Sequence, residues 1–239
     1  MRRSISSLAL ALCLLAAPAW AQECVVVVGQ PTAAAGPVCD TCAGALILTS
    51  HFENADDLTT GTPCGCSTNA DKTWALTNAV YSTTQESDGA YSIYIDDDLD
   101  TAVIPADLSK TAGTITFDIY VATYGQYTSY VAWYVDSNNF LGCYAPSTGN
   151  IFCEYKGNGT SEGVTAAMSN GAWHSVVFEW RTGATDPSIS IAIDGGAATT
   201  SNTNLVEIIG TPTFQINWAY LTNAAQFYLD DLKVYNAWQ

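Results

Sequence analysis

Positively charged side chains are scarce in this sequence. Seven Lys and Arg residues stand against 23 Asp and Glu residues, which gives a formal net charge of −16 over 239 residues. Such a surface repels the phosphates of nucleic acids and anionic lipids, so nucleic acid is excluded as an expected partner. The same surface attracts divalent cations, but it also keeps a protein soluble without any ligand.

Long apolar segments are also missing, because no run reaches the roughly 20 residues that a membrane-spanning helix needs. The longest run, from Leu8 to Ala17, follows two arginines and precedes small residues around Trp20. This order is typical of a secretory signal peptide. We therefore predict that residues 1–21 are cleaved, that the protein is secreted or extracellular, and that it does not insert into a membrane.

Eight cysteines are present, and one of them lies inside the predicted signal peptide. In an exported protein the other seven are expected to form mostly disulfides. The stretch CYAPSTGNIFC places turn residues between Cys143 and Cys153, so we predict that these two pair across neighbouring strands. The other five have no assigned pairing, and the spacing of four of them would also suit zinc; the five are Cys24, Cys39, Cys42, Cys64 and Cys66.

Residues 22–44 are rich in Pro, Ala and Cys and are predicted to form an arm before the main domain. A β-branched run from Val25 to Val28 lies near its start. Such a run can add a strand to a neighbouring sheet, so one alternative function is a structural subunit that self-associates through residues 22–38. The arm can equally fold back on its own domain.

Short strand-like runs separated by turn residues fill residues 45–239. Ten such runs occur, from ALILTSHF to FYLDDLKVY, and no extended helical period is found. The turn sequences DSNN, KGNG and DGG lie between some of them. The pattern predicts an all-β domain, built as a sandwich or a barrel.

Three of these stretches resemble successive strands of a known family. GTITFDIYVA, WHSVVFEWRTGATDPSISIAIDGG and FYLDDLKVYN are similar to laminin-G-like domains, which belong to the concanavalin A-like lectins and glucanases. The resemblance implies a two-sheet antiparallel jelly-roll sandwich for residues 45–239. It implies little about function, because one fold of this kind carries many functions.

Hydrolases of that superfamily carry two or three carboxylates at alternate positions of one strand. No E-x-D-x-E pattern occurs here, and the strand acids Asp118, Glu154 and Glu179 are solitary. G-x-S-x-G is also missing, and His174 follows the core-like Trp173, so His174 is predicted to be structural. A polysaccharide hydrolase or lyase with dispersed carboxylates is therefore an alternative to the non-catalytic function that we expect.

Three of the predicted strands alternate between an apolar side and a side of aromatic and polar residues. Glycans stack on aromatic faces and form hydrogen bonds with amides and carboxylates. We therefore predict a secreted glycan-binding or extracellular interaction module. The candidate ligand-binding residues are Asp118, Tyr120, Tyr130, Tyr134, Gln215 and Asn217. An ordinary solvated sheet face gives the same pattern.

The final run carries two adjacent aspartates, and strict alternation places Asp230 on the same side as Leu232 and Val234. An ionised carboxylate in an apolar layer needs a partner. FEN together with LDDL resembles the strand ends that share a structural calcium in β-sandwich carbohydrate-binding modules. We therefore predict a calcium ion bound by Glu53, Asn54 and Asp230. A β-bulge that turns both aspartates to water is the alternative.

Overall fold

Two antiparallel sheets make up the fold. The structure, a computed structural model, describes residues 46–52, 58–59, 74–96, 101–104, 110–125, 129–145, 149–183, 186–202, 205–217 and 225–236. These residues contain sixteen strands. Within the same ranges, no helix has the length and hydropathy that crossing a membrane requires. The predicted all-β, two-sheet antiparallel sandwich is confirmed.

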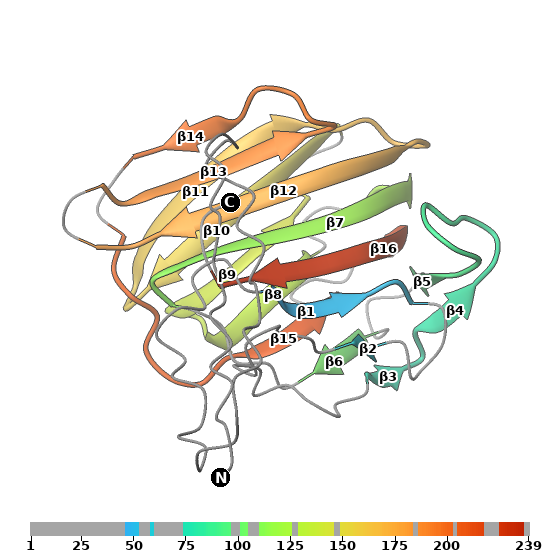
Figure 1. The fold of residues 1–239 in the computed structure, drawn as a ribbon, viewed down its shortest axis with the longest axis horizontal. Coiled ribbons are helices and arrows are strands. Elements are labelled where there is room, and N and C mark those ends of the chain that lie inside the picture. The colour runs from blue at the N-terminus through green and yellow to red at the C-terminus, as the bar shows by residue number, and fades with distance from the viewer. Residues whose placement is uncertain are drawn as a thin grey trace, which may run out of the picture. The chain divides into compact units, whose positions relative to one another are not determined.

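The larger sheet has nine strands, several of which lie side by side at the front of Figure 1. Its main path runs in the order β14 (Thr199–Ser201), β13 (Ser188–Ile193), β12 (Trp173–Arg181), β7 (Ala112–Thr123), β16 (Gln226–Tyr235), β1 (Leu46–Ser50) and β2 (Leu58–Thr59). Two further strands extend from β16, first β5 (Ser92–Ile95) and then β4 (Val80–Ser82).

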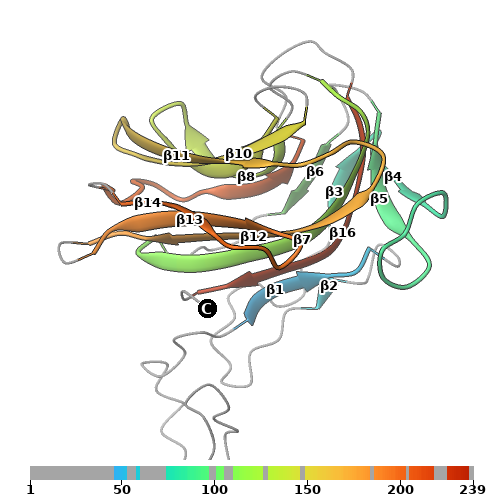
Figure 2. The same cartoon turned by 90° about the horizontal axis from the view of Figure 1, so that it is seen from above.

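The smaller sheet has seven strands and forms the second layer of the sandwich. Its order is β11 (Thr160–Ala167), β10 (Asn150–Gly157), β9 (Asn139–Tyr144), β8 (Ser129–Asp136), β15 (Thr213–Ile216), β6 (Thr101–Ile104) and β3 (Ala75–Thr77). In Figure 2 both sheets bend in the same sense, so the outer face of the seven-stranded sheet is on the concave side of its bend.

The core lies between the two sheets and is built from alternate residues of the long strands. In β7 the side chains of Ile115, Phe117 and Ile119 are buried there, and the intervening residues point outward, as the alternation predicts. The largest buried side chains include Trp133 and Trp180, one from each sheet, whose ring centroids lie 6.4 Å apart. Burial of each such side chain contributes about 1.5–3 kcal/mol to the free energy of unfolding.

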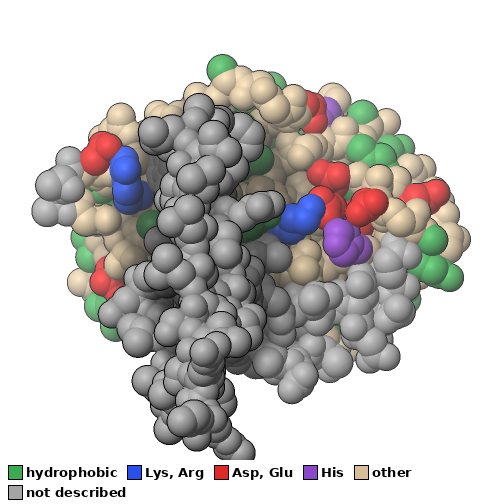
Figure 3. Space-filling view, viewed as in Figure 1, with side chains coloured by type: hydrophobic (Ala, Val, Ile, Leu, Met, Phe, Trp, Pro, Cys, Tyr) green, Lys and Arg blue, Asp and Glu red, His purple; other side chains and the backbone are tan. Residues whose placement is uncertain are grey.

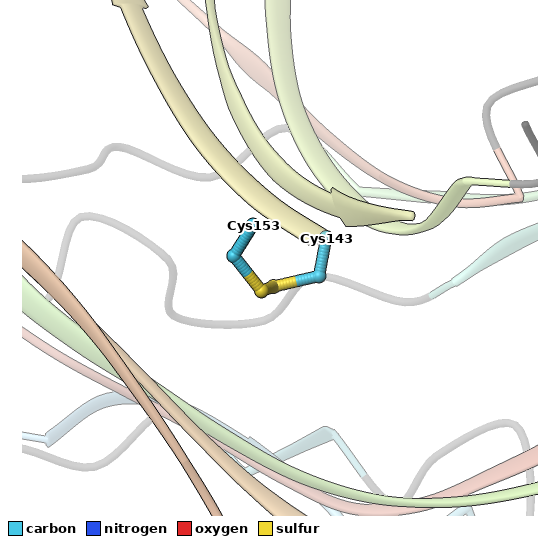
Figure 4. Close-up of a disulfide and its surroundings, with 2 residues drawn as sticks. All are labelled: Cys143 and Cys153. Atoms are coloured by element: carbon cyan, nitrogen blue, oxygen red, sulfur yellow. A yellow bond between two sulfur atoms is a disulfide. The ribbon is translucent and has the colours of Figure 1, made fainter. Parts of the chain in front are cut away.

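The predicted disulfide between Cys143 and Cys153 is present (Figure 4). The two cysteines lie directly opposite each other on β9 and β10, and both are fully buried in the core. The loop they close is short, with a sequence separation of 10 residues. The loop-entropy model gives such a cross-link roughly 2–3 kcal/mol of stabilisation.

A β-bulge interrupts β16 at the two aspartates, and it overturns the predicted face of Asp230. Asp230 pairs with Asp118 and Lys233 pairs with Thr116, so β16 has one more residue than β7 in this interval. Asp231 takes up the extra residue with a φ of 43°. The alternation changes phase there, so Asp230 points away from the core. The prediction that Asp230 shares a face with the buried Leu232 and Val234 is therefore wrong.

Candidate functional site

The structure separates the predicted ligand-binding residues into three groups. Asp118 and Tyr120 lie on the outer face of the nine-stranded sheet, because the core side of β7 is formed by their neighbours. Tyr134 and Gln215 lie on the outer face of the seven-stranded sheet, on the opposite side of the sandwich. No single face therefore holds the predicted set.

The third group does not point outward. Tyr130 was expected to share a face with Tyr134, but its side chain is in the core, only 1% exposed, and packs edge-on against Phe227 at 5.2 Å. A register shift between Ser129 and Val131 in β8 is the cause. Burial also raises the pKa of the Tyr130 hydroxyl. Asn217 is 3% exposed and has a φ of 53°, at the end of β15.

The outer face of the seven-stranded sheet carries a strip with small side chains in its middle. Ala132 on β8 pairs with Gln215 on β15 and with Gly142 on β9, and Gly142 pairs with Glu154 on β10. A Cβ atom at residue 142 would lie 2.4 Å from the carbonyl oxygen of Val131, so the close approach of β8 requires glycine there. The strip therefore has polar side chains at its two ends and nothing larger than a methyl group between them. Three strand spacings make it about 14 Å long.

Aromatic side chains flank this strip on both sides. Tyr134 and Phe140 form a cross-strand pair on one side, and the Lys156 ammonium lies 5.8 Å from the centroid of the Phe140 ring. On the other side, the rings of Tyr144 and Phe152 are 5.0 Å apart. All five side chains are partly exposed. We call the strip and these flanking residues the concave-face site.

Glu154 is held in a defined orientation at one end of the strip. Its two carboxylate oxygens accept hydrogen bonds from the Tyr144 hydroxyl at 3.1 Å and from the Ser161 hydroxyl. Each oxygen has a further lone pair, so the carboxylate can also accept from a ligand hydroxyl. In the sequence Glu154 is recognisable only as a solitary strand acid. The alternation around the buried Cys143 and Cys153 could have revealed it, because the residues between inward-facing positions point outward.

The outer face of the nine-stranded sheet carries a row of aromatic side chains. Tyr94, Tyr228, Tyr120 and Trp173 follow one another across β5, β16, β7 and β12 in register. The successive ring centroids are 4.5, 5.9 and 5.9 Å apart, and Tyr228 is only 8% exposed. Burial raises the pKa of the Tyr228 hydroxyl. Tyr228 is thus closed to a ligand, whereas the other three rings of the row are partly exposed.

Next to this row, the β4–β5 loop, residues 83–91, folds over two aspartates. The backbone N–H groups of Ser87 and Asp88 donate to Asp230 Oδ2, each at 2.9 Å, and the Ser87 hydroxyl donates to Asp118 Oδ2. Asp230 Oδ1 accepts from the backbone N–H of Asp231 at 2.8 Å. Burial raises the pKa of the Asp230 carboxyl, and these three amide donors act against that rise.

These hydrogen bonds remove one reason to expect a calcium ion at Asp230. Asp230 is fully buried, and three backbone amides supply the compensation that we had assigned to a metal ion. The other two predicted ligands, Glu53 and Asn54, lie outside the described residues, as do residues 22–38. Calcium binding at this position therefore stays a prediction.

The adjacent pair Asp118 and Asp230 is also poorly placed for glycoside hydrolysis, because the loop covers Asp230.

His174, near the start of β12, forms hydrogen bonds with Ser169 before this strand and with Asp194 after β13. Its Nδ1 lies 2.8 Å from Asp194 Oδ2, and its Nε2 lies 2.9 Å from the hydroxyl and 3.0 Å from the carbonyl oxygen of Ser169. The residue types match those of a nucleophilic triad. However, the Ser169 carbonyl oxygen can only accept a hydrogen bond, so Nε2 must carry a hydrogen to contact it. An Nε2 that carries a hydrogen cannot act as a base toward the Ser169 hydroxyl. The arrangement fits the structural role that we predicted for His174.

The fold places the chain among two-layer β-sandwich domains. No protein-family model and no curated protein sequence matches it. Several solved structures are similar. One is the receptor-binding domain of botulinum neurotoxin C/D mosaic serotype, at 10% identity and a TM-score of 0.61, covering 82% of this chain and 48% of that one. Another is domain 4 of AbnA, a GH43 extracellular arabinanase from Geobacillus stearothermophilus, in complex with arabinotriose.

The arabinanase domain is 13% identical with a TM-score of 0.62, and the match covers 82% of this chain and 94% of that domain. The binding domain of botulinum neurotoxin DC, in complex with SialylT, is 12% identical with a TM-score of 0.56. The match covers 82% of this chain and 48% of the toxin domain. This chain thus corresponds to about half the length of the toxin domains. At these identities the similarity establishes the fold alone.

Proposed function

We propose that this protein is a secreted, non-catalytic glycan-binding module of laminin-G-like type, and that its glycan lies on the concave-face site. The observation that carries the proposal is the strip between Gln215 and Glu154, which has small residues at its centre and aromatic residues on both sides. Sugar rings stack on partly exposed aromatic faces, and their hydroxyls require donors and acceptors at defined positions. The strip supplies both.

The charge of the protein narrows the class of glycan. With a formal net charge of −16, the surface repels polyuronates, sulfated chains and other polyanions. Lys156 is the only described Lys or Arg among the residues that we assign to the site. A neutral polysaccharide is therefore the expected ligand. One similar fold, domain 4 of the arabinanase AbnA, was solved with arabinotriose, an uncharged oligosaccharide, which supports a neutral ligand for this architecture.

The test measures binding to neutral polysaccharides, with arabinan as the first probe, by affinity electrophoresis and calorimetry. Tyr134→Ala and Gln215→Ala should each weaken binding by about 5- to 100-fold, because one stacking or hydrogen-bonding contact contributes roughly 1–3 kcal/mol. Tyr120→Ala is the matched control, since it removes a partly exposed tyrosine from the opposite face. The control should bind as the wild type does.

Three results would contradict the proposal. Loss of binding in Tyr120→Ala but not in Tyr134→Ala would move the site to the nine-stranded sheet. Release of new reducing ends from a bound polysaccharide would show that the protein is an enzyme. No binding to any neutral polysaccharide, by a protein with an intact cooperative melt, would reject the glycan function itself.

A further inference from the structure

Three side chains with metal-ligating atoms meet beside the bulge of β16. His51 directly follows β1, Asp88 belongs to the β4–β5 loop, and Asp231 is the extra residue of the bulge. Their ligating atoms all lie within 4.8 Å of one another. Figure 3 views this face of the sandwich and shows a histidine among acidic side chains, beside a basic one. Three segments that are distant in the sequence therefore converge on one point.

The distances within this cluster suit a small divalent cation. His51 Nδ1 lies 3.0 Å from Asp88 Oδ2 and 3.1 Å from Asp231 Oδ1. Ligand atoms around a tetrahedral Zn²⁺ with bonds of about 2.0–2.1 Å are separated by roughly 3.3 Å. Two of the three ligand separations are thus close to the tetrahedral value, and the third, between Asp88 and Asp231, is at most 4.8 Å.

Asp231 is oriented for this role by its neighbours. Its Oδ2 accepts a hydrogen bond from the Lys233 ammonium at 2.6 Å, which fixes the carboxylate plane. Its Oδ1 is buried and accepts no hydrogen bond within the described part of the chain, and it faces His51. A carboxylate with one oxygen held by an outer partner and the other directed at the ion is the usual arrangement in metal sites.

We propose that His51, Asp88 and Asp231 bind a first-row transition-metal dication of the Zn²⁺ class. Calcium prefers six to eight oxygen ligands, whereas imidazole nitrogen with carboxylate oxygen suits zinc and its neighbours. The site differs from the predicted calcium site, because it uses none of Glu53, Asn54 and Asp230. Three protein ligands leave a fourth position for water.

The ion would join the end of β1, the β4–β5 loop and the bulge of β16. Two carboxylates give the cluster a charge of −2, and Lys233 offsets one unit, so a dication is electrostatically favoured. Side-chain exposures of 36% for His51, 60% for Asp88 and 24% for Asp231 allow the ion to enter from solvent. Binding to the folded state alone raises stability by mass action.

The experiment uses the full chain, freed of metal with a chelator and then titrated separately with Zn²⁺ and Ca²⁺. We expect one Zn²⁺ site that raises the melting temperature, with Ca²⁺ binding at least tenfold weaker. His51→Ala should weaken Zn²⁺ binding by more than about 100-fold, since even outer partners of a metal site are worth about 10- to 100-fold. Asp88→Asn tests the same site through a side chain that is 60% exposed, and it keeps the backbone N–H that donates to Asp230.

Two controls separate this site from others. His174→Gln changes the only other histidine of the sequence and should leave Zn²⁺ binding as in the wild type. Co²⁺ bound at the proposed site should lack the thiolate charge-transfer absorption that cysteine ligands produce. Zn²⁺ binding that survives both His51→Ala and Asp88→Asn, a thiolate spectrum, equal binding of Ca²⁺, or no binding at all would each overturn the proposal.

Discussion

Replacing Asp230 with alanine should destabilise the protein more than any other single acid-to-alanine change among the described residues. The substitution leaves three backbone N–H groups, those of Ser87, Asp88 and Asp231, without the carboxylate that now accepts their hydrogen bonds. Hydrogen bonds to a charged group are worth about 1.5–3 kcal/mol each, so three of them set an upper limit of roughly 5–9 kcal/mol.

Two effects make the expected loss in the free energy of unfolding smaller than this upper limit. Removing the carboxylate also removes the cost of burying it, which is several kcal/mol. The amides of Ser87 and Asp88 belong to a surface loop and can turn to water, whereas the amide of Asp231 is held in the bulge. We therefore expect a loss of about 2–4 kcal/mol in the free energy of unfolding. Asp230→Asn keeps one acceptor oxygen and should lose about half as much.

Urea unfolding with a shared m-value measures these losses, and amide hydrogen exchange at Ser87 and Asp88 reports the release of the loop. Asp186→Ala is the matched control, because the ion pair of Asp186 with Arg181 is exposed and worth less than about 1 kcal/mol. The loss in Asp230→Ala should persist in excess chelator, because the three amide hydrogen bonds need no metal ion. Any additional loss in excess calcium would measure the predicted calcium site. A loss below about 0.5 kcal/mol would refute the reasoning from backbone amides. So would a loss that occurs only with calcium present.

Two further predictions concern the nine-stranded sheet. The hydrogen bond from His174 holds the pKa of the Asp194 carboxyl below its ordinary value of 3.8. The ionised carboxylate therefore stabilises the fold above pH 3.8, and this stabilisation is lost as the pH falls through the lower pKa of the folded state. Asp194 is half exposed, so Asp194→Asn should cost less than about 1 kcal/mol near neutral pH. Urea titrations should show this difference shrink as the carboxylate becomes protonated at acidic pH, and a difference that is independent of pH would disprove the prediction. At Gly113 a Cβ atom would lie 2.1 Å from the indole ring of Trp180, so Gly113→Ala should destabilise by about 1–3 kcal/mol in thermal melts. Adding Trp180→Phe should recover part of that loss relative to Trp180→Phe alone, and strictly additive losses would show that the two positions are not in contact.

The two outer faces of the sandwich explain why the candidate site was only partly predictable. Alternation correctly assigns Asp118 and Tyr120, and also Tyr134 and Gln215, to outward positions on their own strands. Period-two alternation does not say to which sheet a strand belongs. The residues that complete the concave-face site, Glu154 among them, become neighbours only when the order of strands in the sheet is known.

Local sequence determined ten of the sixteen strands of the described residues and the pairing of Cys143 with Cys153, because each of these depends on residues close together in the chain. The strand pattern left a sandwich or a barrel open, and the two-sheet class followed only from the resemblance to a known family. Tertiary structure decided the side-chain directions that strict alternation predicts wrongly. One extra residue in β16 reversed the face of Asp230, and a register shift in β8 turned Tyr130 into the core. A bulge forms where packing against the neighbouring strand and a covering loop favours it, so its position depends on residues distant in sequence. The contact between His51 and Asp231 also depends on residues distant in sequence, because it forms only when β1 pairs with β16.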